Sequence, residues 1–173
     1  TDLAEEWLKR ERGGKPWCLM IGHKAPHSFY FPEPKYTNAF QNVRVPYPET
    51  AFMLDDKPAW IKERLYTWHG IYGPLFEWRK QFPDDRPEAV KDFEAMTRAY
   101  WGTILSVDDS VGQLLDYLKE SGLEQNTIVV YASDQGFFLG EHGWFDKRWI
   151  FEESARTPFL MRWPGRIQPG RTS

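Results

Sequence analysis

The longest regular pattern of apolar positions lies between Pro87 and Gly122. Apolar or aromatic residues stand at positions 90, 93, 96, 100, 104, 107, 111, 114 and 118, so successive members are three or four residues apart. This spacing places them on one face of an α-helix. Proline suits the first turn of a helix and glycine the residue just after its end, and both stand where the pattern stops. The pattern predicts one long amphipathic helix.

Short apolar runs predict strands on either side of this helix. The run "PWCLMIG" at residues 16–22 suits a buried strand, and the β-branched run "NTIVVYAS" follows the helix at residues 126–133. A further candidate strand is "TPFLMRW" at residues 157–163. A short amphipathic helix is expected before the first strand, within residues 1–15. Strand, long helix and strand in this order are typical of an α/β protein.

The segment between the first strand and the long helix has no sustained period. Residues 29–56 contain four scattered prolines, which predicts loops and extended segments, and a helix is expected from Lys57 to about Trp68. Aromatic residues make up 17% of the chain, and many lie in this region. Their large side chains can fix loops onto the body of the protein. Alternatively, some of the tryptophans present flat faces to sugar rings, the candidates being Trp60, Trp68, Trp78 and Trp144.

Composition limits the classes of partner. A chain of 173 residues with 41% apolar content can bury one core, which predicts a single domain. The net charge of −3 with mixed signs gives no basic stripe for nucleic acid, and no apolar run approaches the roughly 20 residues that cross a bilayer. The single cysteine, Cys18, excludes an internal disulfide, and its apolar neighbours favour a buried position.

Polar residues follow two of the predicted strands. Asp134 and Gln135 come directly after the strand at 126–133, and His27 follows the strand at 16–22. If these strands are parallel, their carboxyl ends lie at one edge of the sheet, where ligands bind in α/β proteins. A carboxylate and an amide oxygen suit calcium or magnesium, although two ligands are too few for either ion.

Each of these residues also has an ordinary interpretation. An aspartate followed by a polar residue and glycine is common in a turn at the end of a strand. His27 alone fits a turn or packing histidine, and Lys147 alone fits a solvated surface charge. Asp108 and Asp109 lie off the apolar stripe of the long helix, which favours a solvated or flanking position over a paired-carboxylate site.

Long segments of the chain resemble the sulfatase family of the alkaline phosphatase superfamily. The segments are "KPWCLMIGHKAPH", "ILSVDDSVGQLLDYLKESGLEQNTIVVYASDQG" and "TIVVYASDQGFFLGEHGWFDKRWIFEESARTPFLMRWPG". The resemblance is weakest in residues 29–85, most specific in residues 126–165, and closest to glycan sulfatases such as the N-acetylglucosamine-6-sulfatases. It implies an α/β fold with a mixed or parallel sheet and flanking helices, of which these residues form an incomplete part.

The resemblance also implies roles for five residues. It places a calcium ion on Asp134 and Gln135, the substrate sulfate on Lys147, and the ester oxygen near the leaving group on His27. His142 lies in the loop that forms the pocket and is a candidate substrate contact, although the family varies at this position. These roles suit sulfate transfer, because charge develops on the equatorial and leaving oxygens as in phosphoryl transfer.

Other features of the family are missing from these residues. The formylglycine nucleophile derives from a cysteine in a Cys-x-Pro/Ala-Ser-Arg motif, whereas Cys18 is followed by Leu-Met-Ile. The first pair of metal-binding aspartates and the carboxy-terminal subdomain have no counterpart either. We therefore expect residues 1–173 to be the central part of a single sulfatase domain, inactive alone, from a periplasmic, extracellular or lysosomal protein by family habit. The expected partner is a sulfated carbohydrate or another sulfate ester.

Two alternatives remain open. One is a phosphomonoester or phosphodiester hydrolase of the same superfamily, although Gln135 argues against the two-zinc enzymes, which have a histidine there. The other is a non-catalytic sugar-binding module that uses the tryptophans. The sulfatase interpretation predicts that His27, Gln135 and Lys147 face one cleft within about 10 Å of Asp134, a distance set by one sulfate group between a metal and two side chains.

Overall fold

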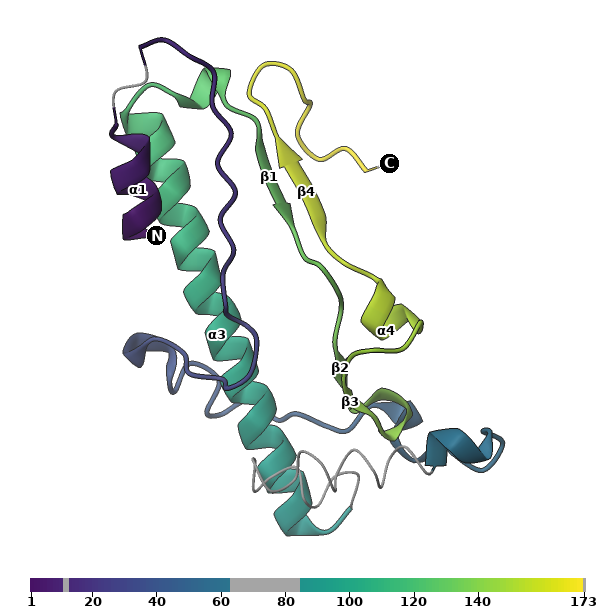
Figure 1. Ribbon diagram of the computed structural model, residues 1–173. Coiled ribbons are helices and arrows are strands. Elements are labelled where there is room, and N and C mark those ends of the chain that lie inside the picture. Colours follow the sequence, from purple (N-terminus) through teal and green to yellow (C-terminus); the bar gives the residue numbers. More distant parts are fainter. Residues whose placement is uncertain (11–12, 63–84, 173) are drawn as a thin grey trace.

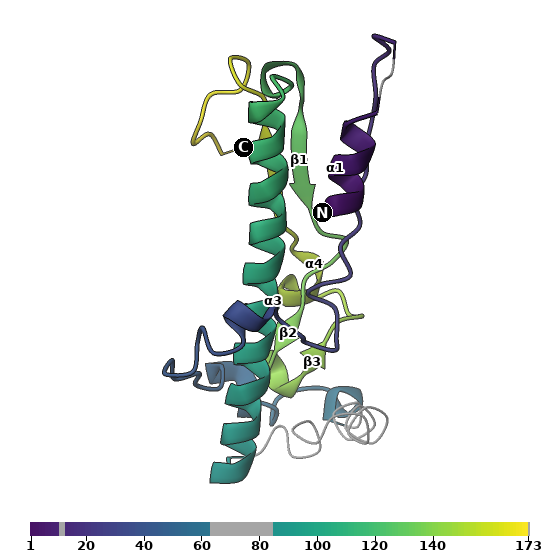
Figure 2. The ribbon, with the colours of Figure 1, turned by 90° about the vertical axis from the view of Figure 1, so that its left-hand side faces the viewer.

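The protein is built along one long helix. The computed structural model describes residues 1–10, 13–62 and 85–172. Helix α3, Pro87–Glu120, runs the length of the molecule, and helix α1, Asp2–Leu8, packs against it (Figure 1). Strands β1, Val129–Ala132, and β4, Phe159–Arg162, lie along the C-terminal half of α3. The shorter strands β2, Phe138–Leu139, and β3, Phe145–Asp146, lie along its N-terminal half with helix α4, Glu152–Ala155 (Figure 2).

Helix α3 confirms the prediction from the apolar pattern, with Pro87 in its first turn. Its end forms a Schellman motif, in which the backbone N–H of Gly122 donates to the carbonyl of Lys119 and that of Leu123 to Leu118. Gly122 has a φ of 72°, a left-handed conformation that favours glycine. Both helix boundaries are therefore encoded by local sequence. No helix among residues 1–10, 13–62 and 85–172 is long and apolar enough to cross a membrane.

The strands expected at 126–133 and 157–163 are confirmed as β1 and β4, but they pair antiparallel. Val129 lies opposite Arg162, and Ala132 lies opposite Phe159. Strands β2 and β3 also pair antiparallel. The expected parallel or mixed sheet is therefore not formed among the described residues, which contain two separate two-stranded sheets.

The strand predicted at residues 16–22 is wrong. The segment is extended and runs in the same direction as β1 (Figure 1), but it forms no strand. Met20 is 94% exposed, and Cys18 is exposed although its apolar neighbours predicted burial. The physical reason is that a strand requires hydrogen bonds to a neighbouring strand. None of the described strands pairs with residues 16–22. An apolar run by itself supplies side chains for a core but no partner for its backbone.

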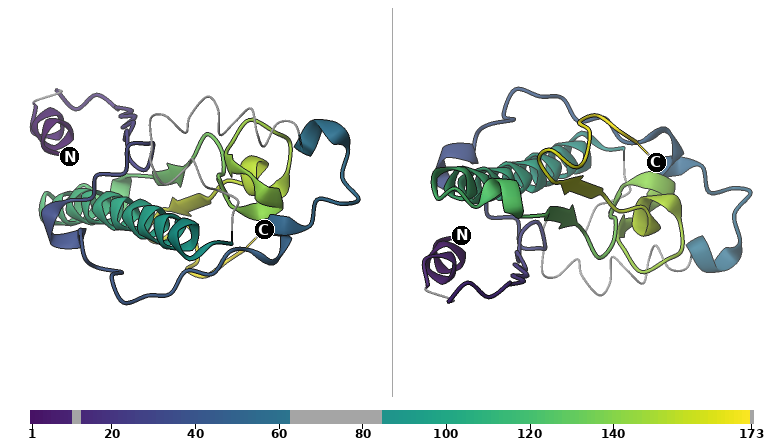
Figure 3. Two further views of the ribbon diagram at one scale, coloured as in Figure 1. Left: turned by 90° about the horizontal axis from the view of Figure 1, so that it is seen from below. Right: turned by 90° about the horizontal axis from the view of Figure 1, so that it is seen from above.

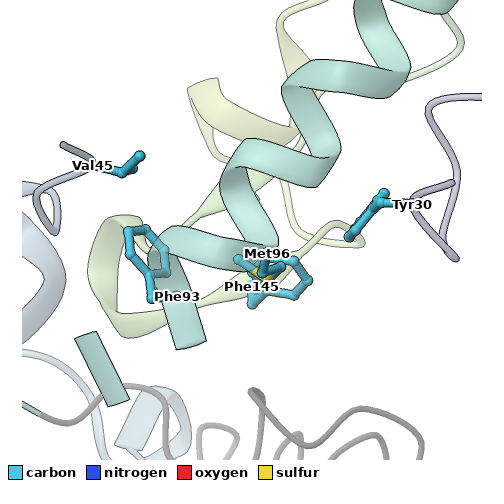
Figure 4. Close-up of a cluster of buried hydrophobic side chains, with 5 residues drawn as sticks. All are labelled: Tyr30, Val45, Phe93, Met96 and Phe145. Atoms are coloured by element: carbon cyan, nitrogen blue, oxygen red, sulfur yellow. The ribbon is translucent and has the colours of Figure 1, made fainter. Parts of the chain in front are cut away.

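The aromatic loops pack onto α3 and the β2–β3 pair. From above and below, the segment of residues 37–62 passes along the outside of α3 towards that pair (Figure 3). One core cluster joins this region to α3 and β3 (Figure 4), and its buried members are Tyr30, Val45, Phe93, Met96 and Phe145. These contacts support the interpretation that aromatic side chains fix the loops.

The second core cluster joins residues 54–61 to β2 and the segment that follows it. Ile61, Phe138 and Trp144 are its buried members, with Leu54, Trp149 and Phe151 packed against them. Trp60, which is 45% exposed, packs edge-on against Trp144. Residues 59–62 begin the helix expected from Lys57 to Trp68. The rest of that helix, with Trp68 and Trp78, lies outside the described residues.

A polar contact fixes residues 34–36 to α3. Tyr36 donates a hydrogen bond from its hydroxyl to Asp109 Oδ2 at 2.7 Å, and Lys35 forms an ion pair with the same carboxylate. The hydrogen bond from Lys35, with that from Tyr36, lowers the pKa of Asp109. Asp108 is exposed. The flanking position expected for these two aspartates is confirmed.

Candidate active site

The candidate site is the loop of residues 133–154, called here the site loop. It leaves β1, forms the β2–β3 pair and ends in α4. Gly136 closes it, because its backbone N–H donates to the carbonyl of Ser154 at 2.8 Å. A Cβ at position 136 would lie 2.2 Å from the carbonyl oxygen of Glu153 and 2.8 Å from that of Arg156. Only glycine allows the two ends of the loop to approach this closely.

Asp134 and Gln135 form the turn directly after β1. The hydroxyl of Ser133 donates to the Gln135 carbonyl at 2.9 Å and lies 3.5 Å from Asp134 Oδ1. The Asp134 carboxylate is exposed. In the part of the chain that the structure describes, no group of three His, Cys, Asp or Glu side chains is placed to hold a metal ion. The donors present are two hard oxygens, a carboxylate and an amide, and calcium binding by them stays a prediction.

The turn between β2 and β3 is held by backbone and side-chain hydrogen bonds. Gly140 donates its N–H to the carbonyl of Trp144 at 2.9 Å, and the N–H of Leu139 donates to Glu141 Oε2 at 2.7 Å. His142 has a left-handed backbone with φ 56°, and its N–H donates to Thr50 Oγ1 at 3.1 Å. The turn is therefore anchored to a residue 92 positions earlier in the chain.

The ring of His142 is engaged by the protein itself. Its Nε2 lies 3.2 Å from Glu153 Oε1, and the ring packs against Phe138 and Phe151 with centroid distances of 6.4 and 5.3 Å. Because a carboxylate accepts, Nε2 carries the proton in this hydrogen bond. A substrate contact for His142 stays a prediction, and Nδ1 is the ring nitrogen left for it.

The side chain of Lys147 is only 15% exposed. Lys147 is therefore not a solvated surface charge, which was the alternative to a functional role. Its Nζ lies 3.7 Å from Oδ1 of Asp146, which is buried at 7% exposure. The other oxygen of the same carboxylate, Oδ2, lies 3.6 Å from a guanidinium nitrogen of Arg148. In the site loop, one buried carboxylate, that of Asp146, therefore contacts both the Lys147 ammonium and the Arg148 guanidinium.

His27 lies on an exposed turn after the 16–22 segment. Its N–H donates to the carbonyl of Lys24 at 2.9 Å, and its ring Nδ1 lies 2.8 Å from the carbonyl of Ser28. A carbonyl only accepts, so Nδ1 donates this hydrogen bond, and Nε2 takes no part in it. The expectation that His27 meets Asp134 rested on two parallel strands of one sheet, and the first of these is not a strand. The shared cleft of His27, Asp134, Gln135 and Lys147 stays a prediction.

Sequence reasoning missed the residues that hold the site loop in place. Asp146 stands beside Lys147 in the sequence, whereas Glu153 reaches His142 and Ser154 reaches Arg148 only through folding of the loop. Thr50 belongs to a distant segment. The one local signal was the sequence Asp-Lys-Arg at 146–148, in which a carboxylate stands beside the lysine. The burial of that carboxylate is not visible in the sequence.

Comparisons with known proteins identify the family. The sulfatase family model matches residues 1–173. An N-acetylglucosamine-6-O-sulfatase of Bacteroides thetaiotaomicron is 34% identical over 218 aligned positions, which include all of this chain and 39% of that protein. The human N-acetylglucosamine-6-sulfatase is 32% identical, with all of this chain and 28% of that protein aligned.

Solved structures agree with the sequence comparison. A structure described as a complex with its substrate D-glucosamine-2-N,6-O-disulfate is 32% identical and superposes with a TM-score of 0.76. The superposition covers 99% of this chain and 44% of that one. The chain therefore has part of an alkaline phosphatase-like fold and spans less than half the length of these relatives. A family match over every residue, together with this structural similarity, shows that the chain belongs to the sulfatase family.

Proposed function

We propose that the protein to which these residues belong hydrolyses sulfate esters of sulfated sugars, and that Lys147 and His27 act on the sulfate group. The observation that carries the proposal is the position of Lys147. Its side chain is largely buried yet bears a cation on the loop that the family model matches throughout. Burying an ammonium is unfavourable unless its charge is paired, and Asp146 contacts it only at 3.7 Å while also contacting Arg148. A buried lysine in this setting suits an anionic ligand better than packing alone.

Lys147 has the chemistry that sulfate transfer needs. Negative charge on the sulfate oxygens spreads in the transition state, and a fixed ammonium stabilises it without reorganisation of water. Asp146 holds the ammonium at 3.7 Å, a distance that leaves N–H groups of Lys147 for a second anion. Lys147 is therefore proposed to bind a sulfate oxygen and to stabilise the charge that develops on it.

His27 is proposed to protonate the leaving oxygen of the sugar. Its Nδ1 is occupied by the carbonyl of Ser28, so Nε2 is the nitrogen that carries the transferred proton. An imidazolium gives this proton to the departing alkoxide and is left neutral, with Nδ1 still donating to the carbonyl. The hydrogen bond to Ser28 thereby fixes the ring and its tautomer during the step.

Asp134 and Gln135 are proposed to hold a calcium ion. Their donor chemistry fits calcium, since both offer hard oxygens and the Asp134 carboxylate is exposed. A bound calcium ion would add positive charge beside the sulfate. The nucleophile has no candidate in these residues, because Cys18 lacks the Pro/Ala-Ser-Arg context of a formylglycine precursor. The chain therefore accounts for charge stabilisation and proton transfer, and not for attack on sulfur.

The proposed substrate class is a glucosamine with a sulfate ester at O6. Two relatives are named N-acetylglucosamine-6-sulfatases, and a related structure is described with D-glucosamine-2-N,6-O-disulfate as substrate. All of them align with this chain over nearly its whole length, including the site loop. The proposal is extended to this protein because the matched part includes the residues that would contact the sulfate.

The test is sulfate release by the full-length protein from N-acetylglucosamine-6-sulfate, measured by ion chromatography. Replacing Lys147 by alanine is expected to lower kcat/KM by roughly 10²- to 10³-fold, as for other groups that stabilise developing charge. Lys57→Ala is the matched control, because Lys57 also pairs with the preceding aspartate but lies outside the site loop. It should leave kcat/KM within about twofold of the parent value.

Three results would overturn the proposal. Release of phosphate but not sulfate from matched esters would favour the phosphoester hydrolase. Sugar binding without hydrolysis would favour the non-catalytic module. Full activity of Lys147→Ala would show that Lys147 takes no part in the reaction.

A further inference from the structure

Asp146 is a buried carboxylate placed between two cations. Its side chain is 10% exposed, with Oδ1 at 3.7 Å from Lys147 Nζ and Oδ2 at 3.6 Å from the Arg148 guanidinium. Each oxygen of the carboxylate thus contacts a different cation.

The backbone on both sides of Lys147 is unusual. Asp146 has a φ of 86° and Arg148 a φ of 101°, a region that residues with a Cβ seldom occupy. Such strained residues persist only where the surrounding structure holds them, and they cluster at functional sites. Here β3 pairs Asp146 with Phe138, and the N–H of Arg148 donates to the Ser154 hydroxyl at 3.3 Å. The peptide that carries Lys147 is therefore fixed at both ends.

We propose that Asp146 is a positioning residue that holds the ammonium of Lys147 where the substrate sulfate binds. This inference rests on the proposed function of Lys147. A lysine side chain has many rotamers, so an unanchored ammonium must be ordered each time that it binds an anion. Asp146 orders it in advance. Because its other oxygen contacts Arg148, the carboxylate is itself held in place while it contacts Lys147.

A purely structural role for Asp146 predicts different behaviour. In that case removing its charge would destabilise the turn and lower activity whether or not residue 147 is a lysine. A positioning role predicts that the effect depends on Lys147. Asparagine is the suitable replacement, since it has nearly the same shape, carries no charge and tolerates a positive φ better than most residues.

The experiment uses the full-length protein and four forms: parent, Asp146→Asn, Lys147→Ala and the double variant. Asp146→Asn is expected to lower kcat/KM for N-acetylglucosamine-6-sulfate by roughly ten- to a hundredfold, the scale of a misplaced catalytic group. The double variant should match Lys147→Ala within about twofold, because the carboxylate then has no lysine to position. Asp109→Asn is the matched control, an ion-paired aspartate on α3 outside the site loop, and should leave kcat/KM unchanged.

A second readout does not require turnover. The rate at which Lys147 is reductively methylated, followed by mass spectrometry, should rise severalfold in Asp146→Asn and not in Asp109→Asn, because the ammonium has lost its anchor. If the parent releases no sulfate, the proposed function fails while this rate still tests the anchor. Unchanged kcat/KM or an unchanged methylation rate in Asp146→Asn would overturn the proposal. The proposal would also be overturned if Asp146→Asn lowered kcat/KM by the same factor in the Lys147→Ala background as in the parent.

Discussion

Replacing Gly136 by alanine tests how the site loop is closed. The added Cβ would lie 2.2 Å from the carbonyl oxygen of Glu153, whereas ordinary contact begins at 3.4 Å. It would also lie 2.8 Å from the carbonyl oxygen of Arg156. Both obstacles are backbone atoms, so no side-chain rotation relieves them. The segment of residues 153–156 must move by about 1 Å or more, since a Cβ seldom comes within 3.0 Å of another atom.

The cost follows from the contacts that this movement breaks. Overpacking in a well-packed site costs about 1–3 kcal/mol. The hydrogen bond from Gly136 N–H to the Ser154 carbonyl, 2.8 Å long, is lost or lengthened, which adds about 0.5–1.5 kcal/mol. The expected loss in the free energy of unfolding is therefore roughly 1.5–4.5 kcal/mol. Activity should fall as well, because the Ser154 hydroxyl accepts from Arg148 N–H beside Lys147.

The assay is urea denaturation of the full-length protein, with Gly112→Ala as the matched control. Gly112 lies within α3, and a Cβ there would meet nothing within 4 Å. Alanine is the better helix former by about 1 kcal/mol, so the same change at position 112 should leave the midpoint unchanged or raise it. A Gly136→Ala variant with the parent midpoint and full activity would refute the reasoning. It would show that α4 can move away from the added Cβ without loss of stability.

Two further predictions concern the 173 residues by themselves. The isolated chain should release no sulfate from an aryl sulfate or from N-acetylglucosamine-6-sulfate, because Cys18 is outside a formylglycine motif; turnover above that of the Lys147→Ala chain would contradict this. Calorimetry should show weak or no calcium binding to the isolated chain, since two oxygens leave at least four of the usual six to eight positions to water. Submicromolar affinity would contradict that expectation.

The helical part of the fold was predictable because its determinants are local. Hydrogen bonds of an α-helix join residues four positions apart, so the apolar period, Pro87 and Gly122 were sufficient to define α3. The apolar runs of β1 and β4 were likewise visible. Their antiparallel pairing was not, because a strand's partner is chosen over the 26 residues between Ala132 and Phe159 by contacts that no local pattern records.

The sequence by itself determined the family, the long helix, two strands and the site loop with Lys147. Only the tertiary structure decided that residues 16–22 form no strand, because burial and pairing require a neighbouring strand. It also decided that Lys147 is mostly buried on Asp146 and that Glu153 engages His142. These contacts depend on a glycine that lets α4 close against the turn after β1 and on left-handed backbone at residues 146 and 148. Such conformations are selected by the packing of the whole loop, and residue type alone does not specify them.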